Sequence, residues 1–143
     1  SQDGSFPMQA RFLPSHPTTV IVVFDDLIGL HPKGAWKLIG SYAPKWRINP
    51  ECAAACTTLS LTRDVGIEVA TFDSAPLVSK ILARERFPFT AVKATTPKGL
   101  ADDLKGRKNV VRVYHPHEQY AQLYGHLGRL ISPDDCQPIA EFK

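Results

Sequence analysis

Two acidic residues come directly after the most apolar run of the sequence. Residues Thr19 to Phe24 are six consecutive β-branched or aromatic residues, and Asp25 and Asp26 come directly after them. An unbroken run of this kind is typical of a strand buried on both faces of a parallel sheet. Ligands bind at the carboxyl ends of such strands, where a reversal of strand order leaves a crevice. We therefore expect Asp25 and Asp26 to be the centre of any site, and a solvated turn after a core strand is the alternative.

Two histidines follow a later apolar run in the same way. His115 and His117 come after Asn109–Tyr114. In an extended segment the two side chains of such an HxH pair project to the same face, as a metal-binding pair requires. The same spacing also arises by chance, so the pair alone does not establish a metal site.

Strand-like and helix-like segments alternate along the chain and predict the elements that position these residues. After the first run, strands are expected at 67–72, 90–93, 109–114 and 129–131, and helices at 50 to 63 or 64, 75–85, 97–104 and 118–126. Alternation at this spacing indicates right-handed βαβ units. The prediction is a single three-layer, doubly wound α/β domain with a mostly parallel sheet of about five strands. If the first, second and fourth strands are neighbours, their polar carboxyl ends meet.

The helix after residue 49 has the clearest predicted boundaries. Asn49 is a capping residue, Pro50 suits the first helical position, and Glu51 places an acid in the first turn. Gly66 is expected to end the helix. The small residues that would let it lie close on a sheet are Cys52, Ala55, Cys56 and Leu59. In the next helix the expected apolar side comprises Leu77, Ile81 and Leu82.

The composition is that of one ordinary domain. The chain has 143 residues, of which 43% are hydrophobic, enough for one core. No run of 18 apolar residues and no signal-peptide pattern occurs, so neither a membrane span nor a secretion signal is expected. Three cysteines without a CxxC motif argue against a disulfide framework and favour a reducing compartment. We therefore expect a cytoplasmic protein.

The two ends of the chain differ from its middle. The only methionine is Met8, and the polar stretch before it suggests that residues 1–8 are a leader left from cloning. The α/β domain is then expected over 9–133. Residues 134–143 are polar and contain proline, and we expect them to form a C-terminal tail.

The segment 27–50, named here the basic aromatic flap, has an unusual composition. It contains no Asp or Glu, but four cations and both tryptophans of the chain. Its glycines and prolines favour a loop with a short hairpin around 36–39 and 45–48. Such a flap suits an anionic substrate with planar bases, through phosphate contacts and stacking. Alternatively, the tryptophans only anchor a long loop. The residues expected to bind substrate are Trp36, Lys37, Trp46 and Arg47.

The order of these polar groups resembles that of the haloacid dehalogenase (HAD) superfamily of phosphohydrolases. Phe24-Asp25-Asp26-Leu27-Ile28-Gly29-Leu30 looks like the first motif of that family, and Ala70-Thr71-Phe72-Asp73 looks like the second. Lys98, within Thr96-Pro97-Lys98-Gly99, fits the third motif. The resemblance covers about residues 19–131. Within this range the chain is similar to small HAD-like domains found in phages and in nucleic-acid repair proteins.

This resemblance implies a mechanism and a metal. Asp25, or Asp26 in a shifted register, would be the nucleophile that attacks phosphorus with the help of Mg²⁺. Thr71 would bind the transferring phosphoryl group, with Ser74 as a less favoured candidate. Lys98 would bind the same group, with Lys93 as its rival.

Two motif positions depart from the family pattern. Leu27 stands where the second acid of the first motif is expected, and Tyr114-His115-Pro116-His117-Glu118 replaces the acids of the fourth. Histidine ligands would suit Mn²⁺ or Zn²⁺ better than Mg²⁺. Either Asp25, Asp26, His115 and His117 form a mixed carboxylate–imidazole metal cluster, or the site has lost catalysis and only binds anions.

Two classes of function follow. The first is a metal-dependent phosphatase that acts on a phosphorylated small molecule, a nucleotide or a nucleic-acid end. The second is a catalytically degenerate module that binds a nucleotide, nucleic acid or protein partner without turnover. A metal-dependent nuclease ranks last because no supporting motif is present, and no GxGxxG follows the first strand to indicate a dehydrogenase.

Overall fold

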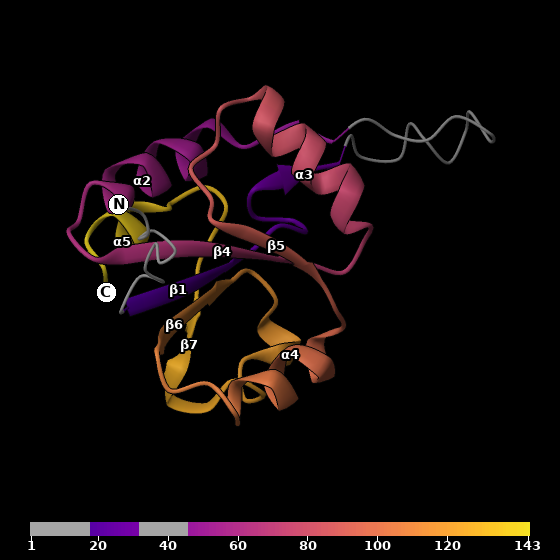
Figure 1. Cartoon of the computed structure of the whole chain (residues 1–143), viewed down its shortest axis with the longest axis vertical. Helices are drawn as coiled ribbons and strands as arrows, with labels where there is room; N and C mark the ends of the chain where they lie inside the picture. Colours follow the sequence, from indigo (N-terminus) through magenta and orange to yellow (C-terminus); the bar gives the residue numbers. More distant parts are fainter. Residues whose placement is uncertain (1–17, 32–45) are drawn as a thin grey trace, which may run out of the picture.

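The centre of the molecule is a five-stranded sheet whose neighbouring strands all run parallel, in the order β5-β4-β1-β6-β7 (Figure 1). The structure is a computed structural model, and it describes residues 18–31 and 46–143. The strands are β1 Thr18–Val23, β4 Val65–Thr71, β5 Ala91–Ala94, β6 Val110–His115 and β7 Gly128–Leu130. The predicted fold class is confirmed. The first, second and fourth predicted strands, β1, β4 and β6, are neighbours, which is the condition for their polar carboxyl ends to meet.

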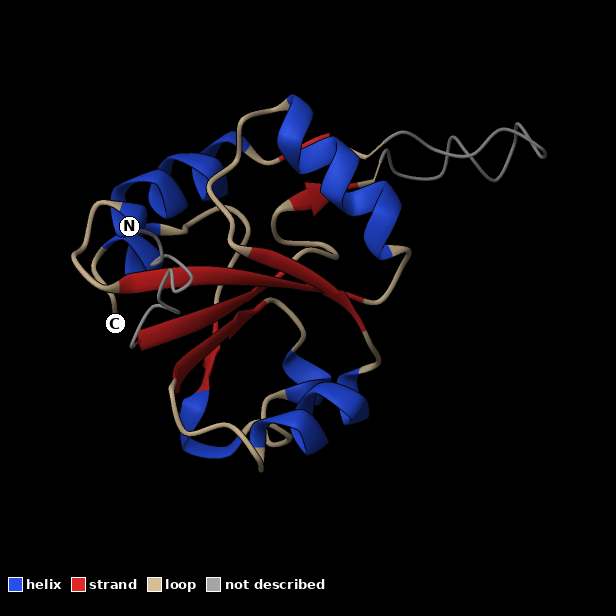
Figure 2. Cartoon of the chain, in the orientation of Figure 1, coloured by secondary structure: helices blue, strands red, loops and turns tan. Residues whose placement is uncertain are grey.

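Helices cover both faces of the sheet and make three layers (Figure 2). On one face lie α2 (Pro50–Ser60), α3 (Ala75–Arg84) and the short α5 (Gln137–Ala140). The other face is covered by α4 (Pro97–Leu104) and the 3-10 turns η1 (Glu118–Tyr120) and η2 (Gly125–Leu127). The chain adds β4 and β5 on one side of β1 and then returns to the other side for β6 and β7. Strand order therefore reverses between β1 and β6.

β1 is buried on both faces, as its sequence predicts. Val20, Val22 and Phe24 pack in the core under α2 and α3, whereas Ile21 and Val23 pack in the core under α4. All five are at most 1% exposed. Burial of each such side chain stabilises the fold by about 1.5–3 kcal/mol. The central strand therefore holds both layers to the sheet.

β4 differs sharply between its two faces. Toward α2 and α3 it presents Val65, Ile67 and Val69, which belong to the larger core cluster. The alternate positions, which share the face of Ile21 and Val23, are Gly66, Glu68 and Ala70. Since these residues are small or charged, the α4 side of β4 lacks the bulky apolar layer of the opposite side.

The first helix begins as predicted but ends early. The Asn49 side chain accepts a hydrogen bond from Glu51 N (3.1 Å) and donates to Leu27 O (3.0 Å), so it caps α2 and ties it to the turn after β1. The helix ends at Ser60, not at residue 63 or 64, and the left-handed residue that follows is Asp64 (φ 65°). Gly66 does not end the helix, because it already lies in β4.

Two other local predictions are wrong. In α3 the buried residues are Val78, Ile81 and Leu82, whereas Leu77 is 44% exposed. The stretch 118–126 is not one helix but contains η1 and the start of η2. Gly125 at φ 57° is left-handed, so a continuous helix cannot pass through it.

The last residues pack against the domain, although we predicted a polar tail at 134–143. α5 packs against α2, and its Ile139 is fully buried. The Tyr114 hydroxyl of β6 donates to the backbone oxygen of Lys143 (2.8 Å). Cys52 and Cys136 are buried between these helices. This segment thus completes the core on that face.

The described parts of the basic aromatic flap form a small antiparallel pair. β2 (Gly29–Leu30) pairs with β3 (Arg47–Ile48). The predicted hairpin strand at 36–39 lies outside the described residues. The pair places the two ends of the flap beside the carboxyl end of β1.

None of the helices in the described ranges combines the length and the apolar character that crossing a membrane requires.

Candidate functional site

A tight turn follows β1 and carries both acids. Gly29 N donates to Phe24 O (2.8 Å), and Asp26 N donates to Gly29 O (3.0 Å). Asp26 has a left-handed backbone (φ 68°), which Asp tolerates better than most residues. A Cβ on Gly29 would lie 2.3 Å from Phe24 Cζ, so only glycine fits over the buried ring. The turn is therefore closed by its own backbone and by the core.

Asp25 is bound by the end of the neighbouring strand. Its Oδ1 accepts hydrogen bonds from Thr71 Oγ1 and from Phe72 N, each 2.9 Å long. The fully buried Thr71 hydroxyl also accepts a bond from Asp73 N (3.0 Å). Burial raises the pKa of the Asp25 carboxyl above its ordinary value, although these hydrogen bonds act in the opposite direction. Asp25 and Thr71, the first two positions of the resemblance, are thus in direct contact.

Asp26 is paired with a residue from the far side of the strand-order reversal. Its Oδ2 lies 3.0 Å from His117 Nε2, which follows β6. The rings of Phe72 and Tyr120 flank the imidazole, each with a centroid distance of 5.8 Å. The pair bridges the ends of β1 and β6, where an open α/β sheet binds its ligands.

His115 has a different environment from His117. It is 1% exposed, and its Nδ1 accepts a hydrogen bond from His117 N (3.2 Å). Because Nδ1 is an acceptor, the neutral ring carries its proton on Nε2. Burial lowers the pKa of His115 below its ordinary value. Its ring packs edge-on against Tyr124, 5.1 Å away.

One hydrogen bond, between Asp26 and His117, joins side chains within the set of four predicted metal ligands. Asp26 contacts His117, Asp25 contacts Thr71, and His115 is bonded to the backbone of His117. Within residues 18–31 and 46–143, no group of three or more His, Cys, Asp or Glu side chains is arranged to hold a metal ion. These side chains therefore do not fit a metal as they stand. Binding of Mg²⁺, Mn²⁺ or Zn²⁺ stays a prediction.

The remaining predicted site residues are placed around this edge. Lys98 is exposed in the first turn of α4, and no hydrogen bond or ion pair within the described ranges joins it to Asp25 or Thr71. Ser74 caps α3 by accepting from Leu77 N (3.3 Å). Leu27, at the position of the missing acid, is fully buried.

Two of the four predicted substrate-binding residues can be located. Trp46 packs edge-on against Phe24, with ring centroids 5.1 Å apart, and against His31 at 3.6 Å. This contact favours the anchoring role for Trp46. Arg47 is exposed in β3, whereas Trp36 and Lys37 lie outside the described residues.

Sequence reasoning missed the aromatic neighbours of His117. Phe72 lies directly after β4 and Tyr120 lies in η1, and only the meeting of these segments at the sheet edge brings the two rings to His117. The sequence did contain a signal for this contact, because Phe72 comes directly after β4 and Tyr120 comes shortly after His117.

Comparison of the chain with models of protein families and with curated proteins finds no match. The fold and site define an α/β protein with a parallel sheet and a polar carboxyl edge. The resemblance to the HAD superfamily depends on the motifs of this chain alone.

Proposed function

We propose that this chain is an HAD-like phosphate-handling domain whose site is the carboxyl edge of β1, β4 and β6. The observation that carries the proposal is the 2.9 Å contact between Thr71 Oγ1 and Asp25 Oδ1. A phosphohydrolase of this kind needs a carboxylate that attacks phosphorus and an adjacent hydroxyl that holds the phosphoryl oxygens. The contact supports these roles for Asp25 and Thr71.

The hydrogen bonds around Asp25 suggest how each group would act. Phe72 N–H fixes one carboxylate oxygen of Asp25 and leaves the other for the reaction. The Thr71 hydroxyl can rotate from Asp25 toward an entering phosphoryl oxygen, because a hydroxyl donates only one hydrogen bond at a time. Lys98, in the first turn of α4, would supply a positive charge to this edge. The step requires the charged form of Asp25, which burial disfavours.

Binding without turnover is the second candidate, and specific observations favour it. The residue at the general-acid position is the buried Leu27, and Asp26 is already bound to His117. Without an acid at the position of Leu27, the same edge would hold a nucleotide, nucleic acid or protein partner without cleaving it. Arg47 of the basic aromatic flap would contribute a phosphate contact.

Phosphate release separates the two candidates. We would assay p-nitrophenyl phosphate, nucleoside monophosphates and a 5′-phosphorylated oligonucleotide with Mg²⁺, Mn²⁺ and Zn²⁺. The catalytic version predicts release by the wild type and none by Asp25→Asn. The matched control is Asp73→Asn, since Asp73 is an exposed acid at the same edge whose carboxylate accepts a hydrogen bond from Ser74 N (2.7 Å). Absence of release with every substrate and metal would reject the catalytic version.

A thermal-shift titration tests the binding version. Metals, nucleotides and single-stranded DNA are added to the wild type and to Asp25→Asn, and the increment in Tm on addition is compared. A ligand of the folded state raises stability by RT ln(1 + [L]/Kd). A response to nucleotide or DNA that survives Asp25→Asn but is lost in Arg47→Ala indicates binding without turnover. No increment with any of these ligands would reject phosphate handling altogether.

A further inference from the structure

Four charged side chains gather on the α4 side of β4 and β5, away from the Asp25 edge. Glu68 lies in the middle of β4 and accepts a hydrogen bond from Arg107 Nη1 at 2.8 Å. The same nitrogen contacts Asp103 Oδ2 of α4 at 3.3 Å. Lys93 of β5 places its Nζ 3.7 Å from Glu68 Oε2. The four form a network with two positive and two negative charges.

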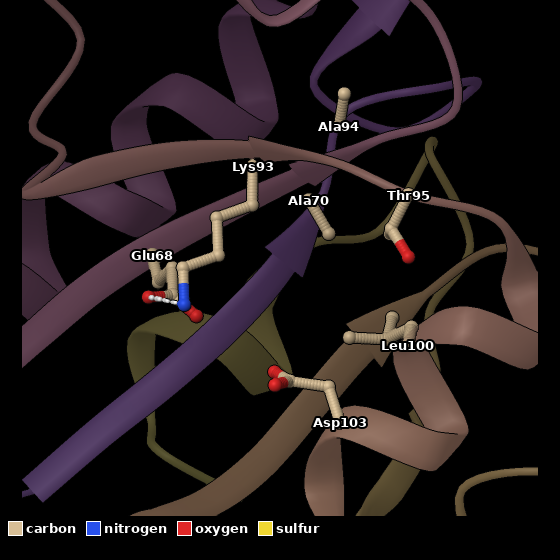
Figure 3. A pocket seen from close by; sticks show the side chains of 7 residues that line it. All are labelled: Glu68, Ala70, Lys93, Ala94, Thr95, Leu100 and Asp103. Carbon is tan, nitrogen blue, oxygen red and sulfur yellow. Dashed lines mark ion pairs between the residues drawn. The ribbon is translucent and has the colours of Figure 1, made fainter.

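A pocket of about 190 Å³ opens beside this network (Figure 3). A small residue leaves part of this space open, because Ala70 of β4 lines the pocket where a bulky side chain would fill the layer. Figure 3 shows Glu68 and Lys93 from the sheet and Asp103 from α4 pointing toward the same space. The lining comprises Glu68, Ala70, Lys93, Ala94, Thr95, Leu100 and Asp103.

A carboxylate is an unusual residue at a position as buried as that of Glu68. Glu68 is 8% exposed, and a buried carboxylate costs free energy even when it is paired. An apolar residue at this position would fill the space with less cost, as Val65, Ile67 and Val69 do on the opposite face. On this face of β4, Glu68 stands as one acid between the small residues Gly66 and Ala70.

Several polar atoms of the lining have no hydrogen bond to other described residues. Arg107 donates to one oxygen of each carboxylate, Glu68 Oε1 and Asp103 Oδ2. The other oxygens, Glu68 Oε2 and Asp103 Oδ1, have no hydrogen-bond donor within 3.5 Å among the described residues. The Lys93 ammonium is too far from Glu68 for a hydrogen bond, and its side chain is 53% exposed. The pocket therefore offers two carboxylate oxygens as acceptors and one ammonium as a donor.

We propose that this pocket binds a small zwitterion, of the size and chemistry of a free α-amino acid. The ligand ammonium donates to Glu68 Oε2 and Asp103 Oδ1, and the ligand carboxylate accepts from Lys93. A short apolar side chain covers Ala70 and Leu100, the apolar part of the lining.

Charge balance selects a zwitterion over a simple ion. Glu68 and Asp103 are compensated by Arg107 and Lys93, so the pocket has no excess of either sign. An amine without a carboxylate would compete with Lys93 for Glu68 and leave the Lys93 charge without a partner. A carboxylate without an amine would meet Glu68 and Asp103 directly. A ligand with both charges gives each of the three groups a partner of opposite charge.

A nuclear magnetic resonance titration with three matched probes tests the proposal. The ¹⁵N-labelled full chain is titrated at millimolar concentrations with L-norvaline, n-butylamine, which lacks the carboxylate, and pentanoate, which lacks the ammonium. Norvaline is expected to shift the amide signals of Glu68, Lys93 to Thr95 and Asp103. Hydrogen bonds to charged groups are strong enough that each truncated probe should bind about tenfold more weakly or worse.

Two substitutions show which side chains hold the ligand. Lys93→Met keeps the apolar stem but removes the carboxylate partner, and because Lys93 is half exposed the fold tolerates it. It should weaken norvaline binding by about tenfold and abolish the advantage of norvaline over butylamine. The control is Lys80→Met, on the exposed surface of α3 across the sheet, which should leave binding unchanged.

Three results would overturn the proposal. One is the absence of localised shifts with norvaline, and another is butylamine or pentanoate binding as tightly as norvaline. The third is an equal loss of binding in Lys80→Met and Lys93→Met.

Discussion

Substitution of Gly29 by alanine should destabilise the fold through one identifiable contact. The added Cβ would lie 2.3, 2.5 and 2.9 Å from three atoms of the Phe24 ring, whereas ordinary contact begins at 3.4 Å. Phe24 is fully buried and packs against Trp46, so its ring cannot move aside without disturbing its neighbours. Overpacking of a core costs about 1–3 kcal/mol, and this overlap points to about 2–3 kcal/mol.

Chemical and thermal denaturation measure this effect. A chain of this size loses about 2–4 °C in Tm for each kcal/mol, so Gly29→Ala should lower Tm by about 4–12 °C. The matched control is Gly106→Ala, because a Cβ there would meet only one atom, Asp103 O at 4.0 Å. That variant should change the free energy of unfolding by less than about 0.5 kcal/mol.

A double substitution identifies the Phe24 ring as the cause. Phe24→Leu removes part of the ring that the new Cβ would meet, so Gly29→Ala should cost less in the Phe24→Leu background than in the wild type. Residues in direct contact show coupling of about 0.5–3 kcal/mol in such a cycle. Wild-type stability in Gly29→Ala, or costs that simply add in the double variant, would refute the reasoning.

Three further predictions concern the packed C-terminal segment and the titratable groups. Ile139→Ala should cost about 2–5 kcal/mol in urea denaturation because Ile139 is fully buried, whereas Leu61→Ala, at an 82% exposed position, should cost less than about 0.5 kcal/mol. Burial raises the pKa of both Tyr114 and Tyr124 to about 12, so the stability that each phenol contributes is present below pH 10 and is lost as pH rises toward 12. When Tm is measured against pH, Tyr→Phe at either position should make this loss smaller. Burial raises the pKa of Asp25, so the stability that this group contributes is present below pH 3.8 and is lost as pH rises through the folded pKa. Asp25→Asn should therefore gain stability relative to wild type as pH rises from about 4 to 7, measured by urea denaturation at both pH values.

Local sequence patterns predicted the sheet because its central strands have a clear apolar signal. The unbroken run that ends at Phe24 indicated a strand with two buried faces, and the Asn49–Pro50 pair indicated a helix start. Boundaries were less accurate where tertiary packing decides them. Gly66 suggested a helix end, but the alternation of Val65, Ile67 and Val69 places it in a strand.

Long-range packing could not be read from local patterns. Residues 134–143 are polar on average, yet Ile139 is buried because α5 meets α2, more than 70 residues earlier in the chain. In α3 the helix phase was misjudged by one residue at Leu77. Neither error is visible without knowing which face meets the sheet.

The candidate site was partly predictable for a topological reason. Neighbouring parallel strands bring their carboxyl ends together, so the meeting of Asp25 with Thr71 follows from the strand order. The different environments of His115 and His117 do not follow, because the burial of His115 depends on Tyr124 in a later turn. The pocket beside Glu68 was missed, although the alternation of large and small residues in β4 was its signal.

The position of β1 has a consequence for how the chain folds. β1 precedes every strand with which it pairs, and its partner on one side, β6, begins at Val110. Non-local parallel pairing of this kind slows folding, since a long loop must close before its contacts form. During synthesis the apolar run from Val20 to Phe24 therefore stays without its second neighbour until residue 115 has left the ribosome, and in that interval it is the segment most exposed to aggregation.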